Sequence, residues 1–214
     1  VACAKRVNQF LDLPVSIVTD SKSITDNDYK FDRVILTDVQ TDNLRANKPW
    51  YNKGRYRAFD YTPYDETLLI DTDYMVNSDT LNQLFDLYDD FMCHKSISIP
   101  MNPPEREFMS PSSFETLWAT VMIFRKTDKV KQIFECMQMV QENYDHYMNL
   151  YGILGNMFRN DYALTIATRI VNGHVEDNSM YIPWPLIHIQ KEVKVYRVDD
   201  TCYKIGRASC RERV

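Results

Sequence analysis

Short apolar runs alternate with amphipathic stretches along most of the chain. Runs rich in β-branched and aliphatic residues predict strands, and these are Val15–Val18, Val34–Leu36, Thr67–Ile70, Ile97–Ile99, Leu117–Phe124 and Val193–Tyr196. Apolar residues at helical spacing predict helices, and these are Cys3–Leu11, one that includes Tyr56–Phe59, one that begins after Ser78 and Asp79, about Asp128–Leu150 and about Asn160–Asn172. This alternation predicts an α/β fold with a largely parallel central sheet, and a ligand crevice beyond the carboxyl ends of its strands.

Polar residues and glycine mark where several of these elements end. Asn160 is predicted to cap the helix that follows it, and Gly173 to end that helix. Ser78 and Asp79 supply a cap and a first-turn negative charge for another helix. The stretch Asn102–Ser113 holds three prolines and three charged residues, which favours an exposed loop.

Length and composition agree with one globular domain. The chain has 214 residues, of which 44% are hydrophobic and 26% charged, so it is long enough to bury a core. It contains no run of about 18 apolar residues, and Val1–Arg6 lacks the apolar stretch of an export signal. We therefore expect a cytoplasmic protein without a membrane span. Because the first residue is Val rather than Met, we also expect the natural start to be missing.

The end of the chain differs in character from the rest. Residues 204–214 (KIGRASCRERV) resemble a translated sequencing adapter, so we place the domain at 1–203 and expect 204–214 to be a non-native tail. A genuine basic tail is the alternative. The tail holds four basic residues and one acidic residue, so the net charge of -5 becomes -8 without it. Such an acidic domain argues against binding to nucleic acid, which needs clustered Lys and Arg.

Two carboxylates directly follow the predicted strand Thr67–Ile70. Asp71 and Asp73 are two positions apart, and side chains at that spacing in a strand point the same way. Both carboxylates can therefore reach one cation at the end of the strand. Mg²⁺ or Mn²⁺ suits such a pair, because these ions take one or two protein carboxylates and complete their shell with water and phosphate oxygens. The alternative is an acidic loop after a strand.

The segment Tyr61–Val76 (YTPYDETLLIDTDYMV) resembles the D-x-D region of GT-A glycosyltransferases, in particular the glycogenin-like and lipopolysaccharide galactosyltransferase-like group. The resemblance extends over about Val15–Ile189. It implies a GT-A fold, in which helices flank a Rossmann-like, mostly parallel central sheet. It also implies transfer of a sugar from a nucleoside-diphosphate sugar donor to an acceptor hydroxyl, with a divalent metal, Mn²⁺ or Mg²⁺, as cofactor.

The same resemblance implies roles for residues on both sides of the motif. The donor-binding residues would be Arg55, Asp71, Tyr74, Ala119, Thr120 and Asn160, the metal ligands Asp71, Asp73 and His188, and the catalytic residue Asp161. Arg55 would reach the donor phosphates, to which a guanidinium group forms forked hydrogen bonds. Asp161 would orient the sugar or the acceptor, and would act as base if the reaction inverts stereochemistry. His188 would be a substitute third metal ligand, and a structural histidine is the alternative.

The chain departs from the family pattern at several positions. Thr120 stands where the family has Gly, and Tyr162 where it has Gln. The closing motif of the family, a His followed by Gly and Lys-Pro-Trp, is absent, and the first family strand would precede Cys3. The departures at Thr120 and Tyr162 lie in the pocket that would surround the transferred sugar, so that pocket differs from the family pattern.

Three aromatic residues near these positions have two interpretations. Trp50, Tyr51 and Trp184 would either stack on sugar rings or serve in packing. Packing in the core, or anchoring at the surface, is the more common role of such side chains.

Two other functions remain open. A haloacid-dehalogenase-like phosphatase also places D-x-D after an apolar strand, although Met75 stands where that motif has Thr or Val. A degenerate transferase-like domain that only binds sugar or protein is the non-enzymatic alternative, because a fold does not guarantee a function.

Overall fold

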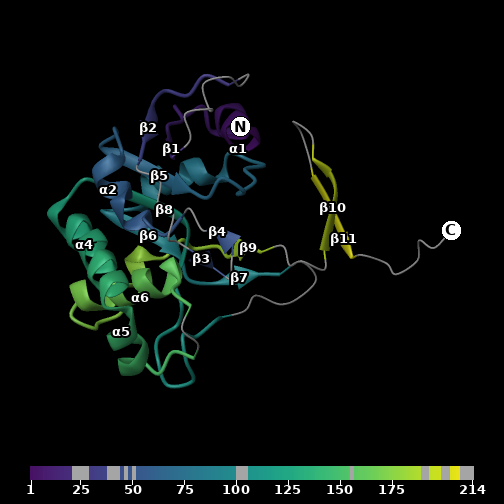
Figure 1. The fold of residues 1–214 in the computed structure, drawn as a ribbon. Coiled ribbons are helices and arrows are strands. Elements are labelled where there is room, and N and C mark those ends of the chain that lie inside the picture. The colour runs from purple at the N-terminus through teal and green to yellow at the C-terminus, as the bar shows by residue number, and fades with distance from the viewer. Residues whose placement is uncertain are drawn as a thin grey trace.

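Helices and several small sheets make up a mixed α/β fold (Figure 1). The structure is a computed structural model that describes residues 1–20, 29–37, 44–45, 48–49, 52–99, 106–154, 157–188, 193–198 and 203–207. Its helices are α1 (Ala2–Leu11), η2 (Arg55–Arg57), α2 (Ala58–Tyr61), η3 (Thr80–Gln83), α3 (Leu84–Leu87), α4 (Asp128–Glu142), α5 (Tyr144–Leu150), α6 (Asn160–Val171) and η4 (Asn178–Met180). Its strands are β1 (Ile17–Thr19), β2 (Val34–Leu36), β3 (Leu44–Arg45), β4 (Lys48–Pro49), β5 (Glu66–Ile70), β6 (Phe91–His94), β7 (Ile97–Ser98), β8 (Trp118–Arg125), β9 (Leu186–Ile187), β10 (Val193–Val198) and β11 (Tyr203–Arg207).

The central sheet has three strands in the order β5-β8-β6, and β8 runs antiparallel to both neighbours. The prediction of a largely parallel sheet is wrong for these pairs. β5 and β6 run in the same direction and are joined through η3 and α3, as a parallel connection requires. The described residues between β6 and β8 form no helix, and β8 returns in the opposite direction. Parallel pairing occurs in two small sheets, between β1 and β2 and between β7 and β9.

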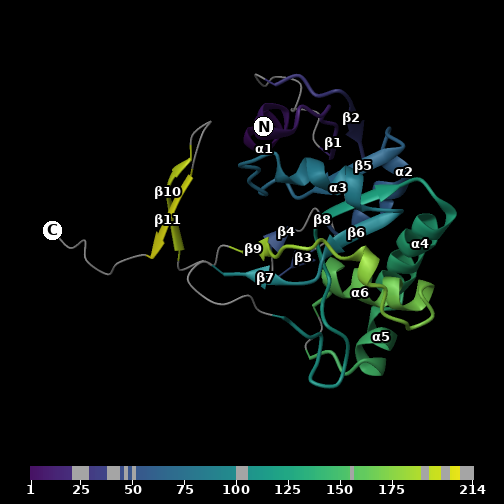
Figure 2. The same ribbon diagram turned by 180° about the vertical axis from the view of Figure 1, so that it is seen from behind.

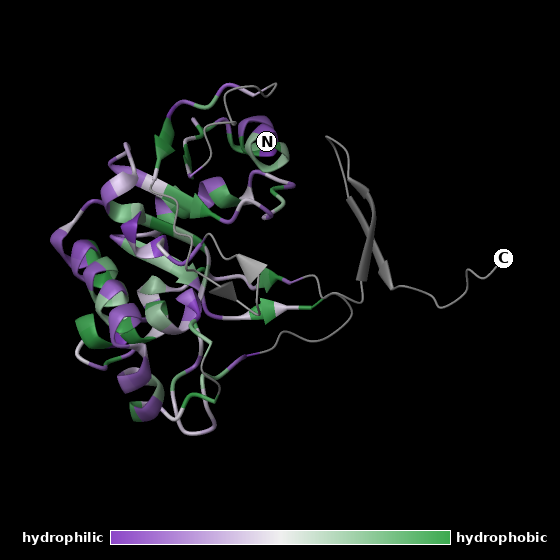
Figure 3. Cartoon of the chain, in the orientation of Figure 1, coloured by the Kyte–Doolittle hydropathy of each residue, from purple (hydrophilic) through white to green (hydrophobic). Residues whose placement is uncertain are grey.

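The core lies on both faces of this sheet, because β8 is apolar along most of its length. Met122 and Phe124 pack with residues of α4 and α6, whereas Val121 and Ile123 pack with residues of α1, η3 and α3. All four side chains are fully buried, as expected for a strand covered on both faces. In Figures 1 and 2 the helices α4 to α6 lie on one side of the sheet and α1 on the other. Figure 3 shows apolar strands beside an α4 of mixed polarity.

The helix predicted at Asp128–Leu150 is two helices, so that prediction is wrong in its middle. α4 ends and α5 begins on either side of Asn143. The side-chain amide of Asn143 donates to the carbonyl of Met139 at 2.9 Å. Asn forms such local bonds to the backbone in competition with a continuous helix.

The ends of α6 agree only in part with prediction. Asn160 is the first helical residue rather than the cap, and Arg159 occupies the cap position without a side-chain capping bond. The amide of Asn160 donates instead to the carbonyl of Asn52 at 2.7 Å, so it ties α6 to the residues ahead of η2. Gly173 follows the helix as predicted, with a φ of 63°, and its N–H donates to the carbonyl of Ile170 at 3.1 Å. Glycine adopts this left-handed conformation without strain.

The loop predicted at Asn102–Ser113 is described from residue 106 onward. Its prediction as an exposed loop is wrong at Met109 and Ser110, which are buried. Met109 packs in the core beside α4 and α6, and the hydroxyl of Ser110 donates to the carbonyl of Tyr151 at 2.8 Å. The proline-rich and charged sequence of this segment therefore gave no indication that Ser110 is anchored to Tyr151.

The C-terminal strands form a hairpin of their own. β10 contains the strand predicted at Val193–Tyr196, and it pairs antiparallel with β11. The predicted boundary after residue 203 falls inside β11, and residues 208–214 lie outside the described residues. Among the helices of the described ranges, none has the length and apolar character needed to cross a membrane.

Candidate functional site

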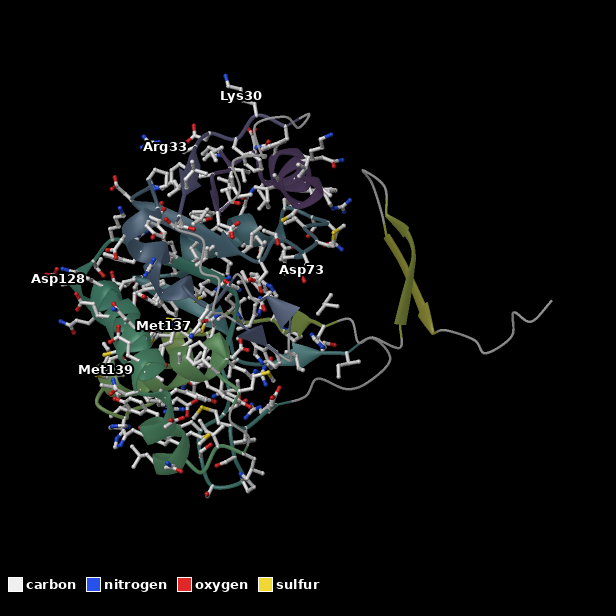
Figure 4. The ribbon with its side chains drawn as sticks, in the orientation of Figure 1. Lys30, Arg33, Asp73, Asp128, Met137 and Met139 are labelled. Atoms are coloured by element: carbon white, nitrogen blue, oxygen red, sulfur yellow. The ribbon has the colours of Figure 1, made fainter. Side chains whose placement is uncertain are left out.

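The residues that follow β5 form part of the lining of a cavity of about 650 Å³. Hydrogen bonding continues one residue past the strand, since the N–H of Asp71 donates to the carbonyl of Thr120 at 3.1 Å. The chain then turns, and the N–H of Tyr74 donates to the carbonyl of Asp71 at 3.0 Å. This turn carries both Asp71 and Asp73 into the cavity lining (Figure 4 labels Asp73).

All nine residues assigned to the site from the sequence line this one cavity. They come from η2, the turn after β5, β8, the start of α6 and the residue after β9, and they are Arg55, Asp71, Asp73, Tyr74, Ala119, Thr120, Asn160, Asp161 and His188. Trp184 lines the cavity too, whereas Trp50 and Tyr51 lie outside the described residues. Asn52, Trp118 and Arg159 belong to the lining without having been assigned to it.

Arg55 and Asp71 form an ion pair in this lining. Nη1 of Arg55 lies 2.6 Å from Oδ1 of Asp71, and the amide of Asn52 donates to the same oxygen at 3.2 Å. Nη2 of Arg55 donates to the carbonyl of Thr120 at 3.2 Å. The Arg55 side chain is only 5% exposed, against 28% for Asp71, so Arg55 fixes the end of β5 against β8. Its role toward donor phosphates stays a prediction.

Negative charge at Asp71 is opposed by its surroundings. Burial raises the pKa of Asp71, the Arg55 guanidinium acts in the opposite direction, and the carboxylates of Asp73 and Asp161 raise the pKa further. The outcome is a raised pKa in spite of the ion pair. A cation bound beside these three carboxylates would reduce their mutual repulsion.

Asp73 is exposed, and its carboxylate makes no hydrogen bond or ion pair with any residue that the structure describes. His188 is also exposed, and its ring centroid lies 6.1 Å from that of Trp118. Within the described ranges, no group of three or more His, Cys, Asp and Glu side chains is arranged to hold a metal ion. The role of His188 as a third metal ligand stays a prediction. Two carboxylates still fit an ion such as Mg²⁺ or Mn²⁺ that also takes phosphate oxygens.

Both carboxylate oxygens of Asp161 are engaged by protein groups. Oδ1 accepts a hydrogen bond from the N–H of Ala119 at 2.9 Å. Oδ2 accepts from Nε and Nη2 of Arg159 at 3.2 and 3.0 Å. Asp161 is therefore held in one orientation between β8 and α6, which suits a residue that orients a bound molecule.

Arg159 is the functional candidate that the sequence reasoning missed. Its Nη1 also donates to Glu107 at 2.8 Å, and its guanidinium lies 4.8 and 5.5 Å from the ring centroids of Tyr162 and Trp118. Burial alone would lower the pKa of Arg159, but the carboxylates of Asp161 and Glu107 raise it, so the group stays charged. The helix dipole disfavours a cation at a helix N-terminus, and an Arg at the start of α6 therefore signals nearby carboxylates.

The segment that leads into β9 adds the aromatic side chain of Trp184 to the cavity lining. The N–H of Leu186 donates to the carbonyl of Ser96, and the N–H of His188 to that of Ser98, both at 2.9 Å. This parallel pairing with β7 places the half-buried Trp184 in the same cavity as the charged groups. The cavity thus offers charged groups and an aromatic surface to one ligand, a combination typical of small-molecule sites.

No match to this chain was found among protein-family models, curated proteins or solved structures. The resemblance to GT-A glycosyltransferases therefore rests on the motif residues quoted above. The structure adds one cavity whose lining contains three carboxylates, two guanidinium groups and two tryptophan side chains.

Proposed function

We propose that this chain is a metal-dependent glycosyltransferase, which moves a sugar from a nucleoside-diphosphate sugar to an acceptor hydroxyl. The observation that carries the proposal is the shared position of the nine residues assigned from the motifs, which all line one cavity. These residues extend from Arg55 to His188 along the chain. A D-x-D that occurred by chance would give no reason for the distant residues Ala119 and Asp161 to join Asp71 there.

The charge of the cavity supports the need for a cation. Three carboxylates and two guanidinium groups line it, so one net negative charge remains. Arg55 and Arg159 are each already paired with a carboxylate. A diphosphate would therefore meet an uncompensated negative site, and a divalent cation held by Asp71 and Asp73 would remove that repulsion.

The proposed roles follow from how each side chain is held. When bound, Mn²⁺ or Mg²⁺ would supply a Lewis acid that stabilises the charge developing on the departing diphosphate. Arg55 would keep the Asp71 carboxylate in place, and Asp161, held by Arg159, would orient the sugar or the acceptor hydroxyl. Asp73 would offer its free carboxylate to the ion. The remaining donor contacts would come from Tyr74, Ala119, Thr120 and Asn160.

The phosphatase alternative fits the geometry less well. A phosphatase that attacks phosphorus with a carboxylate needs that group ionised, with one oxygen open to the substrate. Oδ1 of Asp71 already accepts hydrogen bonds from Arg55 and Asn52, so only Oδ2 is open, and burial raises the pKa of this carboxyl group. The aromatic surface around Trp184 also has no function in hydrolysis of a simple phosphate ester.

The direct test is donor hydrolysis by the purified chain. Nucleoside-diphosphate sugars with different bases and sugars are incubated with Mn²⁺, and released nucleoside diphosphate is measured by chromatography. We expect release that stops when a chelator removes the metal, and no hydrolysis of p-nitrophenyl phosphate. Hydrolysis of that ester alone would support the phosphatase instead, and donor binding without release would support a non-enzymatic binding domain.

A matched pair of variants tests the metal site. Asp73→Asn should abolish metal-dependent release, whereas Asp79→Asn removes an exposed carboxylate outside the lining and should leave it unchanged. Calorimetry of the unmodified chain should show that Mn²⁺ binds more tightly once a nucleoside diphosphate is present, because the diphosphate completes the shell of the ion. Equal affinity with and without the diphosphate would contradict a shared site.

A further inference from the structure

The part of the cavity lining that carries Trp184 has a gap in its backbone hydrogen bonding. Backbone N–H groups on both sides of it, at Ile182 and Leu186, donate to carbonyls of β6 and of the residues before β7, at 2.9 Å each. Between them, Pro183 and Pro185 have no N–H to donate. Within the described chain, the N–H of Trp184 makes no hydrogen bond either. The backbone alone therefore does not hold Trp184 against the sheet.

A side chain from β6 spans this gap. Nδ1 of His94 lies 3.0 Å from the carbonyl oxygen of Trp184. Because a carbonyl oxygen can only accept, Nδ1 carries the proton and donates. His94 is 1% exposed, and its Nε2 is buried without a hydrogen-bond partner among the described residues. The bond to Trp184 is thus the one that fixes the ring and its tautomer.

We propose that His94 is a positioning residue of the cavity, whose Nδ1–H holds Trp184 where the prolines interrupt the backbone pairing. His94 is also the cross-strand partner of Trp118 in β8, so it connects both tryptophans of the lining. His94 itself does not line the cavity, and it acts on a ligand only through Trp184. The effect on nucleotide binding rests on the proposed function, whereas the hydrogen bond does not.

Histidine suits this position because a neutral donor is required there. Burial lowers the pKa of His94 to about 4, against the opposing effect of the bond to Trp184. The ring is therefore neutral at physiological pH and has a single proton, which the carbonyl of Trp184 draws to Nδ1. A cationic donor such as Lys would have to be buried with its charge unpaired.

The hydrogen bond can be tested on the unmodified chain without any ligand. Nitrogen-15 NMR of the histidine rings distinguishes a proton on Nδ1 from one on Nε2. We expect the Nδ1–H tautomer for His94 across the neutral pH range. A proton on Nε2 would overturn the proposal, whatever the chain binds.

Three variants then separate positioning from packing. His94→Leu replaces the ring by an apolar side chain of similar bulk that has no hydrogen-bond donor. His94→Asn carries an amide N–H that can take the place of Nδ1–H. His146→Leu removes an exposed imidazole on α5 and serves as the control. With 5-fluorotryptophan incorporated, the fluorine resonance of Trp184 should move toward that of the free amino acid in His94→Leu only. An unmoved resonance in His94→Leu, or no recovery in His94→Asn, would contradict the positioning role.

Binding of uridine or guanosine diphosphate with Mn²⁺ supplies the functional readout. We expect His94→Leu to lower the affinity for whichever nucleotide binds more tightly by about fivefold, which is the effect of one hydrogen bond. His94→Asn should restore that affinity. If no nucleoside diphosphate of any base binds the unmodified chain while the tautomer and the Trp184 resonance behave as expected, the proposed function fails and the positioning of Trp184 stands. If the nucleotide binds all four proteins equally, nucleotide binding in the cavity stands and the positioning role fails.

Discussion

Replacing His94 by Asn should remove one component of the acid sensitivity of the fold. Burial lowers the pKa of His94 from 6.5 to about 4, and the hydrogen bond to Trp184 opposes this shift only in part. The unfolded chain takes up a proton on this ring at a pH where the folded chain does not. The stability that neutral His94 contributes is therefore fully present above about pH 6.5, and it is lost as the pH falls toward about 4.

The size of the effect follows from the two pKa values. A difference of about 2.5 units at 1.36 kcal/mol per unit corresponds to about 3 kcal/mol. About 2 kcal/mol of this is lost by about pH 5, where the unfolded ring is mostly charged and the folded ring mostly neutral. With a side chain 1% exposed, solvent screening does not reduce the value.

The assay is urea unfolding of the unmodified chain and of His94→Asn, at several values between about pH 7.5 and about pH 5. Asn keeps a donor for Trp184 but has no proton to gain, so the difference between the two proteins isolates the titration of His94. We expect the unmodified chain to lose about 2 kcal/mol more than the variant over this range. His146→Asn, which removes an exposed imidazole, is the control and should follow the unmodified chain. Parallel pH profiles for the unmodified chain and His94→Asn would refute the reasoning.

Three further predictions concern the site and the end of the chain. Arg55→Lys should lower the free energy of unfolding by about 2 kcal/mol, measured with urea, because one ammonium group cannot hold both Asp71 and the carbonyl of Thr120. Asp161→Asn should lower the transfer rate about a hundredfold while nucleoside-diphosphate affinity stays nearly unchanged; loss of stability alone, with normal turnover per folded molecule, would make the residue structural. Deleting residues 204–214 should shift the melting temperature by no more than about two degrees, because among the described strands β11 pairs with β10 alone. A larger shift in calorimetry would show that the tail belongs to the fold.

The apolar pattern located most elements but not their directions. Six of the eight residues of β8 are buried, and the nearly continuous apolar run that such a strand requires made Leu117–Phe124 easy to identify. The direction of β8 depends on the segment that joins it to β6, and the apolar residues of a strand do not indicate that direction. β6 itself was missed because Phe91–His94 contains no β-branched residue, although all four residues are buried. Its sequence therefore shows no alternation, and Phe91 is its one strongly strand-favouring residue, so only the packed sheet identifies it.

The site residues also fall into two groups, those that the local sequence indicates and those that only the fold brings together. The pair Asp71 and Asp73 was accessible from the sequence, because the strand before them and the spacing between them are both local. The partners of Asp71 were not, since the pairing with Arg55 and Asn52 depends on how η2 packs against β5. Likewise, Arg159 stands beside the assigned Asp161, but its second partner Glu107 lies 52 residues away in the chain.

The same contacts imply an order of interaction for the proposed ligands. A cation alone would find the carboxylate of Asp73 and only one oxygen of Asp71, because Oδ1 of Asp71 is engaged by Arg55 and Asn52. A diphosphate alone would meet guanidinium groups that already bind carboxylates, within a lining that keeps one net negative charge. Each ligand would therefore bind weakly by itself, and each would supply the charge that the other lacks. Because coupling free energy is reciprocal, the factor by which a nucleoside diphosphate tightens Mn²⁺ must equal the factor by which Mn²⁺ tightens the nucleotide.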